Sequence, residues 1–417
     1  MGVENSARVG AAAQGAARLS YGKLVAFLSA RTRDVASAED ALADAFEAAL
    51  HDWPVQGVPA SPEAWLLAVA RRKLIDASRR RRSGEQVAIT LQLITDVSTD
   101  SGDPGSLPDD RLALMFACTH PAIDPSVRAP LMLQTLLGFD AATIASAFLV
   151  SPATMGQRLV RAKTKIRQAG IPLVVPEHSE LAGRLDAVLA ATYAAFAEGW
   201  SDPAGADAHR RNLAEEGVWL ARLLASLLPD EPEALGLLAL VLYAQARRHA
   251  RRDAAGDYVP LASQDTARWD RLLLDEAEAL LRHASTFARV GRYQLEAAVQ
   301  SAHVVRRLGG RADWPAIVGL YDALLAMTAS PVVAINRAVA LAESQGAAAG
   351  LAALDAVAGE PRLREYQPYW AARANLLERT GDPDAAGAAY QRAIGLEGDA
   401  AVRRHLQSCL LALSEPG

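Results

Sequence analysis

Apolar positions in this chain recur at helical spacing, most clearly between residues 151 and 166. The apolar side chains there follow one another at intervals of four, three and four residues: Met155, Leu159, Ala162 and Ile166. Such spacing places them on one side of a helix. Ser151 is a suitable N-cap, and Pro152 suits the first helical position, where no N–H is needed. The pattern predicts a helix that begins near residue 152 and packs through one face.

The neighbouring sector of this helix is basic and polar and carries no acid. Its members are Thr154, Gln157, Arg158, Arg161, Thr164 and Lys165. The preceding residues, 140–150, predict a shorter helix and a tight turn. A helix-turn-helix DNA-binding unit typically consists of two short helices. The second of them has one face for packing and one basic, amide-bearing face for the DNA groove. A solvated basic face on an ordinary helix is the alternative, and this helix alone does not exclude it.

Ala and Leu dominate the apolar residues, which predicts an all-α protein because both lose little entropy in a helix. At 417 residues the chain exceeds one ordinary core, so we expect about two to four domains. Cys118 and Cys409 form no CxxC pattern, the N-terminus has no apolar signal core, and no apolar run is long enough to cross a bilayer. We therefore expect a cytoplasmic protein that does not contact a membrane.

Composition divides the chain into four segments. Residues 1–83 predict a helical unit that ends in an arginine run. Residues 84–108 are rich in Gly, Ser and Asp and predict a linker, although its part at 87–91 is apolar enough to lie on a partner. Residues 109–170 predict a second helical unit that ends with the basic helix. Residues 177–417 predict a large helical region.

Charge is shared unevenly between these segments. Residues 1–176 carry 19 basic and 17 acidic side chains, a net charge of +2, and the remainder carries 24 and 31, a net charge of −7. A run of cations surrounds Asp76 alone: Arg71, Arg72, Lys73 and Arg79 to Arg82. Because phosphate neutralisation depends on local cation density, this run is a candidate nucleic-acid contact. The opposite charges of the two parts also suggest the hypothesis that they dock.

Residues 37–82 combine an acidic helix, a rigid loop and a basic helix. Ser37 and the acids after it predict a helix start, and Asp40, Asp44 and Glu47 share one face. Residues 53–62 are too rich in Pro and Gly for a helix. The next helix is expected from Ser61 or Pro62 to about residue 82.

This combination suits single-stranded DNA, where cations follow the phosphates, rings stack on bases and a loop holds an extruded base. The alternative for the two aromatic residues, Trp53 and Trp65, is that they are plain core residues. Trp65 lies inside an apolar run of the sequence, which favours a core position for it.

The C-terminal region shows weak internal repetition. Its clearest copy fits the tetratricopeptide (TPR) spacing, in which small residues let two antiparallel helices approach: Trp370, Ala374, Leu377, Ala386, Tyr390 and Ala393. Residues 381–383 supply the turn. A looser copy lies 36 residues earlier, at Ala338, Gly350, Leu354 and Val357, and residues 314–324 fit the second helix of another. A generic Ala-rich bundle is the alternative. In both cases the surface of this region is better suited to binding a partner than to catalysis.

Enzyme and metal signals are weak. Cys118 and His120 are close in sequence, but two ligands without a second pair are too few for a structural zinc site, so a packed cysteine and a surface or capping histidine are expected. No nucleophile elbow, phosphate-binding loop or HExxH motif occurs. The C-terminal region has only scattered histidines: His209, His249, His283 and His303. We expect no catalytic residue, metal or cofactor.

Residues 38–46, 64–76 and 109–170, in this order, resemble regions 2 and 4 of a bacterial RNA polymerase sigma factor of the extracytoplasmic-function (ECF) group. No single motif decides the resemblance, since helix-turn-helix units are common, but the two sets occur in the right order. The tail resembles the subgroup with a TPR-like C-terminal extension, through Tyr193-x-x-Phe196-x-Glu198-Gly199-Trp200, Tyr293-Gln294-Leu295 and residues 313–317.

The resemblance implies two sets of DNA contacts. In region 2, the loop from Val55 to Pro62, with Gln56, Gly57 and Val58, would capture a flipped −10 base, while the non-template strand and upstream duplex would be held by Arg71, Arg72, Lys73, Arg79 and Arg80. In region 4, the −35 major groove would be read by Thr154, Gln157, Arg158 and Arg161, since Arg suits guanine and Gln suits adenine. Lys163, Lys165 and Arg167 would hold phosphate.

The resemblance also implies partners. Asp40, Asp44 and Glu47 would meet the β′ clamp helices of core RNA polymerase, and region 4 would meet the β flap. Position 43 is Ala where relatives often carry Gln. The implied function is promoter-specific initiation, with the extension governing activity in cis or through a regulatory protein.

Two other functions are open at this point. A helix-turn-helix regulator with a TPR sensor would not join polymerase, but it leaves residues 37–82 unexplained. An enzyme in the C-terminal region would need a pocket with convergent titratable groups.

Overall fold

The computed structural model describes residues 20–80, 109–148, 150–200, 208–305 and 312–413. These residues form helices joined by turns, without a β-strand; an isolated antiparallel bridge joins Arg252 and Tyr258. The predicted all-α class is confirmed.

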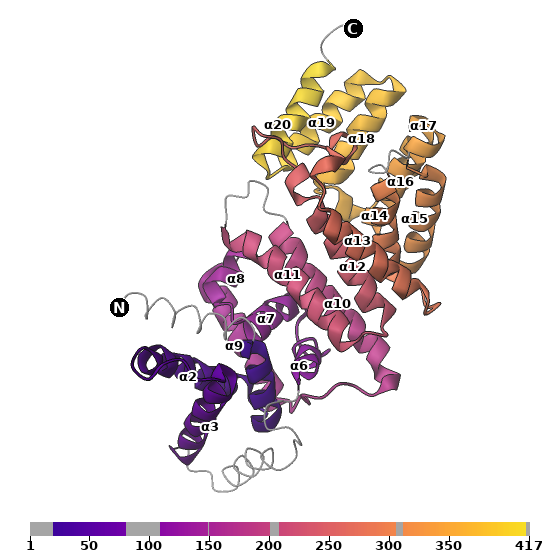
Figure 1. The fold of residues 1–417 in the computed structure, drawn as a ribbon. Helices are drawn as coiled ribbons and strands as arrows, with labels where there is room; N and C mark the ends of the chain where they lie inside the picture. The colour runs from indigo at the N-terminus through magenta and orange to yellow at the C-terminus, as the bar shows by residue number, and fades with distance from the viewer. Residues whose placement is uncertain (1–19, 81–108, 149, 201–207, 306–311, 414–417) are drawn as a thin grey trace. The chain divides into compact units, whose positions relative to one another are not determined.

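The chain is divided into two compact units, Met1–Gly199 and Trp200–Gly417 (Figure 1). No helix in the described ranges is long and apolar enough to span a membrane. The predicted linker, 84–108, lies outside the described residues.

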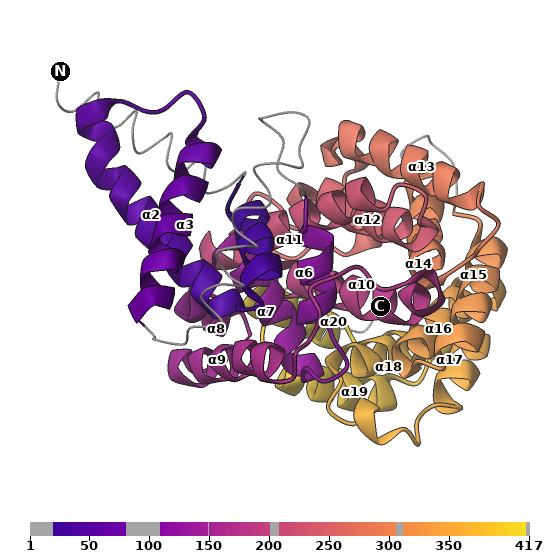
Figure 2. The ribbon, with the colours of Figure 1, turned by 90° about the horizontal axis from the view of Figure 1, so that it is seen from below.

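The N-terminal part of the first unit is a three-helix arrangement. Residues 20–32 are helical, and α2 (Val35–Gln56) packs against α3 (Pro62–Arg80) (Figure 2). The largest side chains of this core are at most 1 % exposed: Leu24, Phe27, Leu28, Leu42, Trp53 and Leu66. The basic helix α3 and the acidic helix α2 therefore pack on the same core.

Helix α2 departs from the sequence prediction at both ends. Its N-cap is Asp34, whose carboxylate accepts a hydrogen bond from the Ser37 N–H, so Ser37 lies in the first turn. At the other end, α2 continues through Pro54 to Gln56, so residues 53–56 are helical and not part of a loop. Pro54 cannot donate to the carbonyl of Leu50 and its ring crowds that group, yet α2 continues for two more residues before it ends. Gly57, at φ 87°, ends the helix.

The C-terminal part of the first unit consists of α6 (Arg111–Cys118), α7 (Pro125–Leu137), α8 (Ala141–Ala147), α9 (Pro152–Gln168) and α10 (His178–Trp200). Asp124, Asp140 and Ser151 cap α7, α8 and α9 through their side chains. Helix α10 is tied to α6, because the Arg184 guanidinium donates to the Phe116 carbonyl at 2.9 Å. The first unit thus includes the first helix of the segment after Pro176.

The second unit is a succession of antiparallel helices. Its α-helices are α11 (Ala208–Leu227), α12 (Pro232–Ala246), α13 (Arg271–Ser285), α14 (Arg292–Val304), α15 (Trp314–Thr328), α16 (Pro331–Gln345), α17 (Ala347–Asp355), α18 (Gln367–Thr380), α19 (Pro383–Leu396) and α20 (Ala400–Ala412). Helices that follow one another in sequence pack together, as Figure 1 shows. Helix α12 is buried around nearly its whole circumference, as its continuous apolar sequence requires.

Two helix pairs lie where the repeat spacing predicts them: α16–α17 and α18–α19. In the second pair, the predicted small and large residues lie in one core: Ala374, Leu377, Ala386, Tyr390 and Ala393. In the first, Ala338 and Leu354 belong to a second core, against which Val357 packs. A Cβ on Gly350 would lie 2.6 Å from the Ala342 Cβ and 2.7 Å from the Ala338 carbonyl oxygen. Only glycine allows these two helices to pack so closely.

Candidate nucleic-acid and polymerase interfaces

Helix α9 has the two faces that its sequence predicts. Met155, Leu159 and Ile166 are 1 % exposed, and Ala162 is 7 % exposed. The polar sector is exposed at Thr154, Gln157, Arg158, Arg161 and Lys165. The Ser151 hydroxyl accepts from the Thr154 N–H at 3.2 Å, which fixes the start of the helix. This exposed sector is a cationic, amide-bearing surface on a rigidly packed helix.

Helices α8 and α9 form the predicted helix-turn-helix pair. The Asp140 carboxylate accepts from the N–H groups of Ala142 and Thr143, both at 2.8 Å. Gly156 lies in the first turns of α9, where a Cβ would stand 4.0 Å from that of Ala141. The two helices pack directly on each other, so the pose of α9 is determined by the body of the first unit.

The far end of α9 contacts α2. The Lys163 ammonium donates to Glu39 Oε2 at 2.6 Å, and the two side chains are only 13 % and 11 % exposed. One turn later, Arg167 donates to Asp34 Oδ2 at 3.2 Å. Two of the three cations expected to hold phosphate therefore pair with acids of α2, while Lys165 is exposed.

Burial sets the charge balance of this contact. The pKa of Glu39 is raised, chiefly by burial, against the opposing effect of Lys163. The pKa of Asp34 is lowered: burial would raise it, but hydrogen bonds from Ser37 and Arg167 prevail. The pKa values of the two acids are thus shifted in opposite directions, so their contributions to stability depend on pH in opposite ways.

Three of the acids of α2 occupy one exposed face. Asp40, Asp44 and Glu47 are exposed, together with Ala43 between them. Leu50 continues this face with 57 % of its surface exposed. An acidic face with an exposed apolar residue at its end is suited to a basic protein surface.

The basic helix α3 contains cations in different environments. Arg72 and Lys73 are exposed, and Lys73 lies 3.5 Å from Asp44 in a surface ion pair of little energetic weight. Arg71 is half-buried above the Phe27 ring, at 5.5 Å from its centre. Burial and the neighbouring Arg31 lower its pKa. Arg79 and Arg80 form the end of α3, and their side chains lie outside the described set.

The predicted capture loop is divided between helix and loop. Val55 and Gln56 lie in the last turn of α2, and Gly57 and Val58 lie in the loop at 57–61. Val55 is 85 % exposed, and Val58 is 37 % exposed. Exposed apolar side chains beside an exposed glycine form a surface on which a base can be placed.

The two tryptophans near this loop pack against each other. Trp53 is 1 % exposed, and its ring lies edge-on to that of half-buried Trp65, with centroids 5.5 Å apart. Both act as core residues in this arrangement, as the alternative interpretation holds.

Cys118 and His120 each have a hydrogen-bond partner close by. Burial raises the pKa of Cys118 to about 12, and its Sγ lies 3.4 Å from the Thr135 hydroxyl. His120 accepts from the Ala122 N–H through Nδ1. In the described ranges, no group of three His, Cys, Asp or Glu residues is placed to hold a metal.

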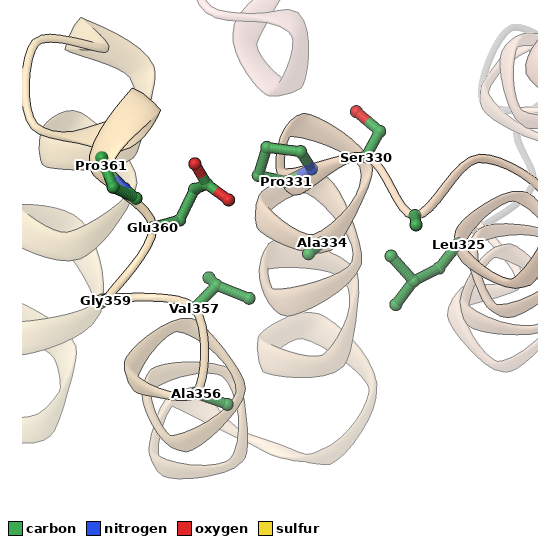
Figure 3. Close-up of a pocket in the computed structure, with 10 residues that line it drawn as sticks. Leu325, Ser330, Pro331, Ala334, Ala356, Val357, Gly359, Glu360 and Pro361 are labelled. Atoms are coloured by element: carbon green, nitrogen blue, oxygen red, sulfur yellow. The ribbon is translucent and has the colours of Figure 1, made fainter.

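A shallow pocket of about 460 Å³ lies in the second unit, between α15, α16 and the segment after α17 (Figure 3). Ten residues line it, and Glu360 is the titratable one among them. Its carboxylate binds the Arg362 guanidinium, which lowers its pKa to about 2. The pocket therefore lacks the convergent titratable groups of an active site.

The comparison with known families agrees with the N-terminal arrangement. Residues 18–84, which include α2 and α3, match the model of sigma-70 region 2. The chain therefore contains a sigma-70 region 2. A sigma-70 region 2 implies a role in transcription initiation together with core RNA polymerase and promoter DNA. The acidic face of α2 and the basic helix α3 both lie within the matched segment.

Two further comparisons extend beyond this segment. Residues 184–285 match a family of unknown function (DUF6596). Over 381 residues, the chain is 38 % identical to "Uncharacterized protein R00370" of Rhizobium meliloti (strain 1021), and the alignment covers 90 % of this chain and 89 % of that protein. The two proteins therefore belong to one family. No solved structure matches the chain.

Sequence reasoning missed the contacts between distant segments. Glu39 and Lys163 are 124 residues apart, and Arg31 binds Asp110 at 3.0 Å across 79 residues. No local pattern marks such pairs. The cap at Asp34 had a local signal, since Val35, Ala38 and Leu42 are spaced for one buried face that begins before Ser37.

Proposed function

We propose that this protein is an ECF-type sigma factor that directs core RNA polymerase to a restricted set of promoters. Region 2, at residues 20–80, binds and opens the −10 element, and region 4, at 109–170, reads the −35 element. The observation that carries the proposal is the exposed basic face of α9, opposite four buried apolar residues, in the same unit as a sigma-70 region 2.

The −35 element is read in the major groove by the exposed sector of α9. Arg158 and Arg161 suit guanine, Gln157 suits adenine, and the Thr154 hydroxyl suits either base edge. Lys165 supports the docking through phosphate, which positions the helix without selecting a sequence.

The −10 element is opened at the loop after α2. A base extruded from the duplex rests at residues 55–58, where Val55 and Val58 offer exposed apolar surface. Arg72 and Lys73 hold the displaced strand by its phosphates. Arg71 is half-buried, so it supports α3 as well as the strand.

Binding to polymerase uses the acidic face of α2. Asp40, Asp44 and Glu47 meet the basic β′ clamp helices, and Leu50 adds apolar contact at the end of that face. Ala43 supplies only a methyl group at the centre of this face. Region 4 meets the β flap.

The contact between α2 and α9 opens when the protein binds a promoter. The −10 and −35 elements are separate along the DNA, so the two regions must move apart to reach both. Opening breaks the pairs Lys163–Glu39 and Arg167–Asp34. Both cations then become available to phosphate, which compensates the two lost pairs.

The C-terminal extension governs this activity in cis, by docking on regions 2 and 4 or by accepting a regulatory protein. Its net charge of −7 and its TPR-like helix pairs support this role. Promoter-specific transcription by a chain that ends at residue 199 should therefore differ from that of the full chain. Unchanged transcription would contradict the regulatory role.

The proposal is tested with core polymerase and the triple variant Asp40→Ala, Asp44→Ala, Glu47→Ala. We expect this variant to lose most of its binding to core polymerase, because three contacts with a basic surface disappear together. Asp384→Ala, which removes an exposed acid of α19, is the control and should bind as the native chain does. A helix-turn-helix regulator that does not join polymerase would show no binding by any of the three proteins.

A further inference from the structure

The proposed reading of the −35 element leaves one exposed residue of α9 without a role. Of the residues described in α9, Val160 alone combines a large apolar side chain with exposure, and 61 % of its surface is open to solvent. Packing does not explain this valine, because the buried residues of α9 lie on another side of the helix. Helix propensity does not explain it either, since a β-branched residue is a weaker helix former than alanine or leucine. Val160 is therefore a candidate contact residue.

Val160 lies on the side of α9 that faces away from the core. Residues that follow one another at intervals of four, three and four share one side of a helix. The row that contains Val160 in this way is Ala153, Gln157, Val160 and Thr164. It lies nearly opposite the buried row of Met155, Leu159, Ala162 and Ile166. In a helix-turn-helix unit whose second helix is packed through one side, the opposite side is the one that can enter the major groove.

The side chains of this row match the groups that A·T base pairs present in the major groove. Gln157 is exposed, and its amide suits adenine. The other three members carry methyl groups, and Val160 carries more of them than Ala153 or Thr164. Small apolar side chains of this kind contact the C5-methyl group of thymine, which guanine, cytosine and adenine lack. An exposed valine beside an adenine-reading glutamine thus has an apolar counterpart on the DNA.

We propose that Val160 reads the C5-methyl group of a thymine in the −35 element, a role that rests on the proposed function of α9. Three residues advance a helix by about 4.5 Å, and successive base pairs are about 3.4 Å apart. Val160 therefore addresses the base pair next to the one that Gln157 reads. A protein contact fits less well, because a single valine beside Gln157 and Arg161 is not an apolar patch.

The test is binding of promoter duplexes, located by mapping of transcript starts, to core RNA polymerase that carries the full-length chain. Each thymine of the −35 element is replaced in turn by deoxyuridine, which pairs as thymine does and lacks only the C5-methyl group. We expect one replacement, beside an adenine of the element, to weaken binding about fourfold, as the loss of one buried methyl group implies.

Val160→Ser removes both methyl groups, so the loss caused by that deoxyuridine should disappear in this variant. Serine and valine have similar helix propensities, so α9 should keep its fold. Val339→Ser is the matched control, because it makes the same change at an exposed valine of α16. This control should keep the fourfold loss of the native chain.

Three results would overturn the role of Val160. They are equal binding of all the deoxyuridine duplexes, a loss that persists in Val160→Ser, and weaker binding of Val160→Ser to core polymerase without DNA, which would show a protein contact. In each of them the native chain still directs polymerase to promoters, so the proposed function stands. If the complex with the native chain binds no promoter specifically, the proposed function fails, and the role of Val160 fails with it.

Discussion

At the scale of single residues, the division of α9 into two faces determines which side chains can specify a sequence. Leu159 and Ile166 are buried, so their substitution acts on stability. Arg158 and Gln157 are exposed, so their substitution acts on recognition. Lys163 belongs to neither set in the present arrangement, because it pairs with Glu39.

Arg158→Ala should relax discrimination at one position of the −35 element. The loss of a bidentate contact to guanine corresponds to about 1–3 kcal/mol of discrimination. The measurement is competition between duplexes that differ at single −35 positions, bound by the reconstituted polymerase complex. Gln168→Ala, at the exposed end of α9, is the control. A uniform loss of affinity across all duplexes would show instead that Arg158 contacts phosphate.

The residues of α9 were predictable because its signals are local. A cap, a proline and four apolar positions lie within one helix, and each acts on its own neighbours. The end of α2 was not predictable in this way. Pro54 indicates a break, but the helix continues past it because Trp53 is held in the core and residues 54–56 need only one more turn.

At the scale of elements, close approach of helices α16 and α17 depends on one glycine. Gly350→Ala should lower the free energy of unfolding of the second unit by about 1–3 kcal/mol, because the new Cβ overlaps Ala342 and the Ala338 carbonyl. Gly387→Ala in α19 is the matched control, since its Cβ would lie 3.7 Å from Leu410 Cδ1, an ordinary contact. That variant should be neutral or gain up to about 1 kcal/mol from helix propensity. Equal stabilities of the two variants in chemical unfolding would contradict the packing.

The contact between α2 and α9 should depend on pH through Glu39. A carboxyl whose pKa is raised on folding contributes stability that is complete below its unfolded value, near 4.5, and is lost as the pH rises through the raised pKa. Glu39→Gln should remove this decline from the free energy of unfolding, measured in urea across the range above pH 4.5. Asp34→Asn is the counterpart: because the pKa of Asp34 is lowered, its contribution is present above 3.8 and is lost on acidification. Identical pH profiles of Glu39→Gln and the native chain would contradict this account of the contact.

The candidate site at this scale was only partly predictable from sequence. Its separate elements, the acidic helix, the basic helix and α9, each have a local pattern. Their contacts do not: Glu39 meets Lys163 and Arg31 meets Asp110 because of how the helices pack, and no spacing encodes that.

At the scale of the whole molecule, the chain joins a sigma-70 region 2 and a helix-turn-helix pair to a helical unit of comparable size. The boundary between the compact units lies at residue 199, later than the change in composition near residue 176, because α10 is tied to α6. The match to a family of unknown function at 184–285 crosses this boundary.

The most direct test of the role in initiation is transcription in vitro with core RNA polymerase and the full-length chain on fragmented genomic DNA, followed by mapping of the transcript starts. We predict defined starts that appear only when the chain is added and that share two upstream elements, at −35 and −10. Starts that are the same with and without the chain, or that share no upstream element, would contradict a sigma factor function.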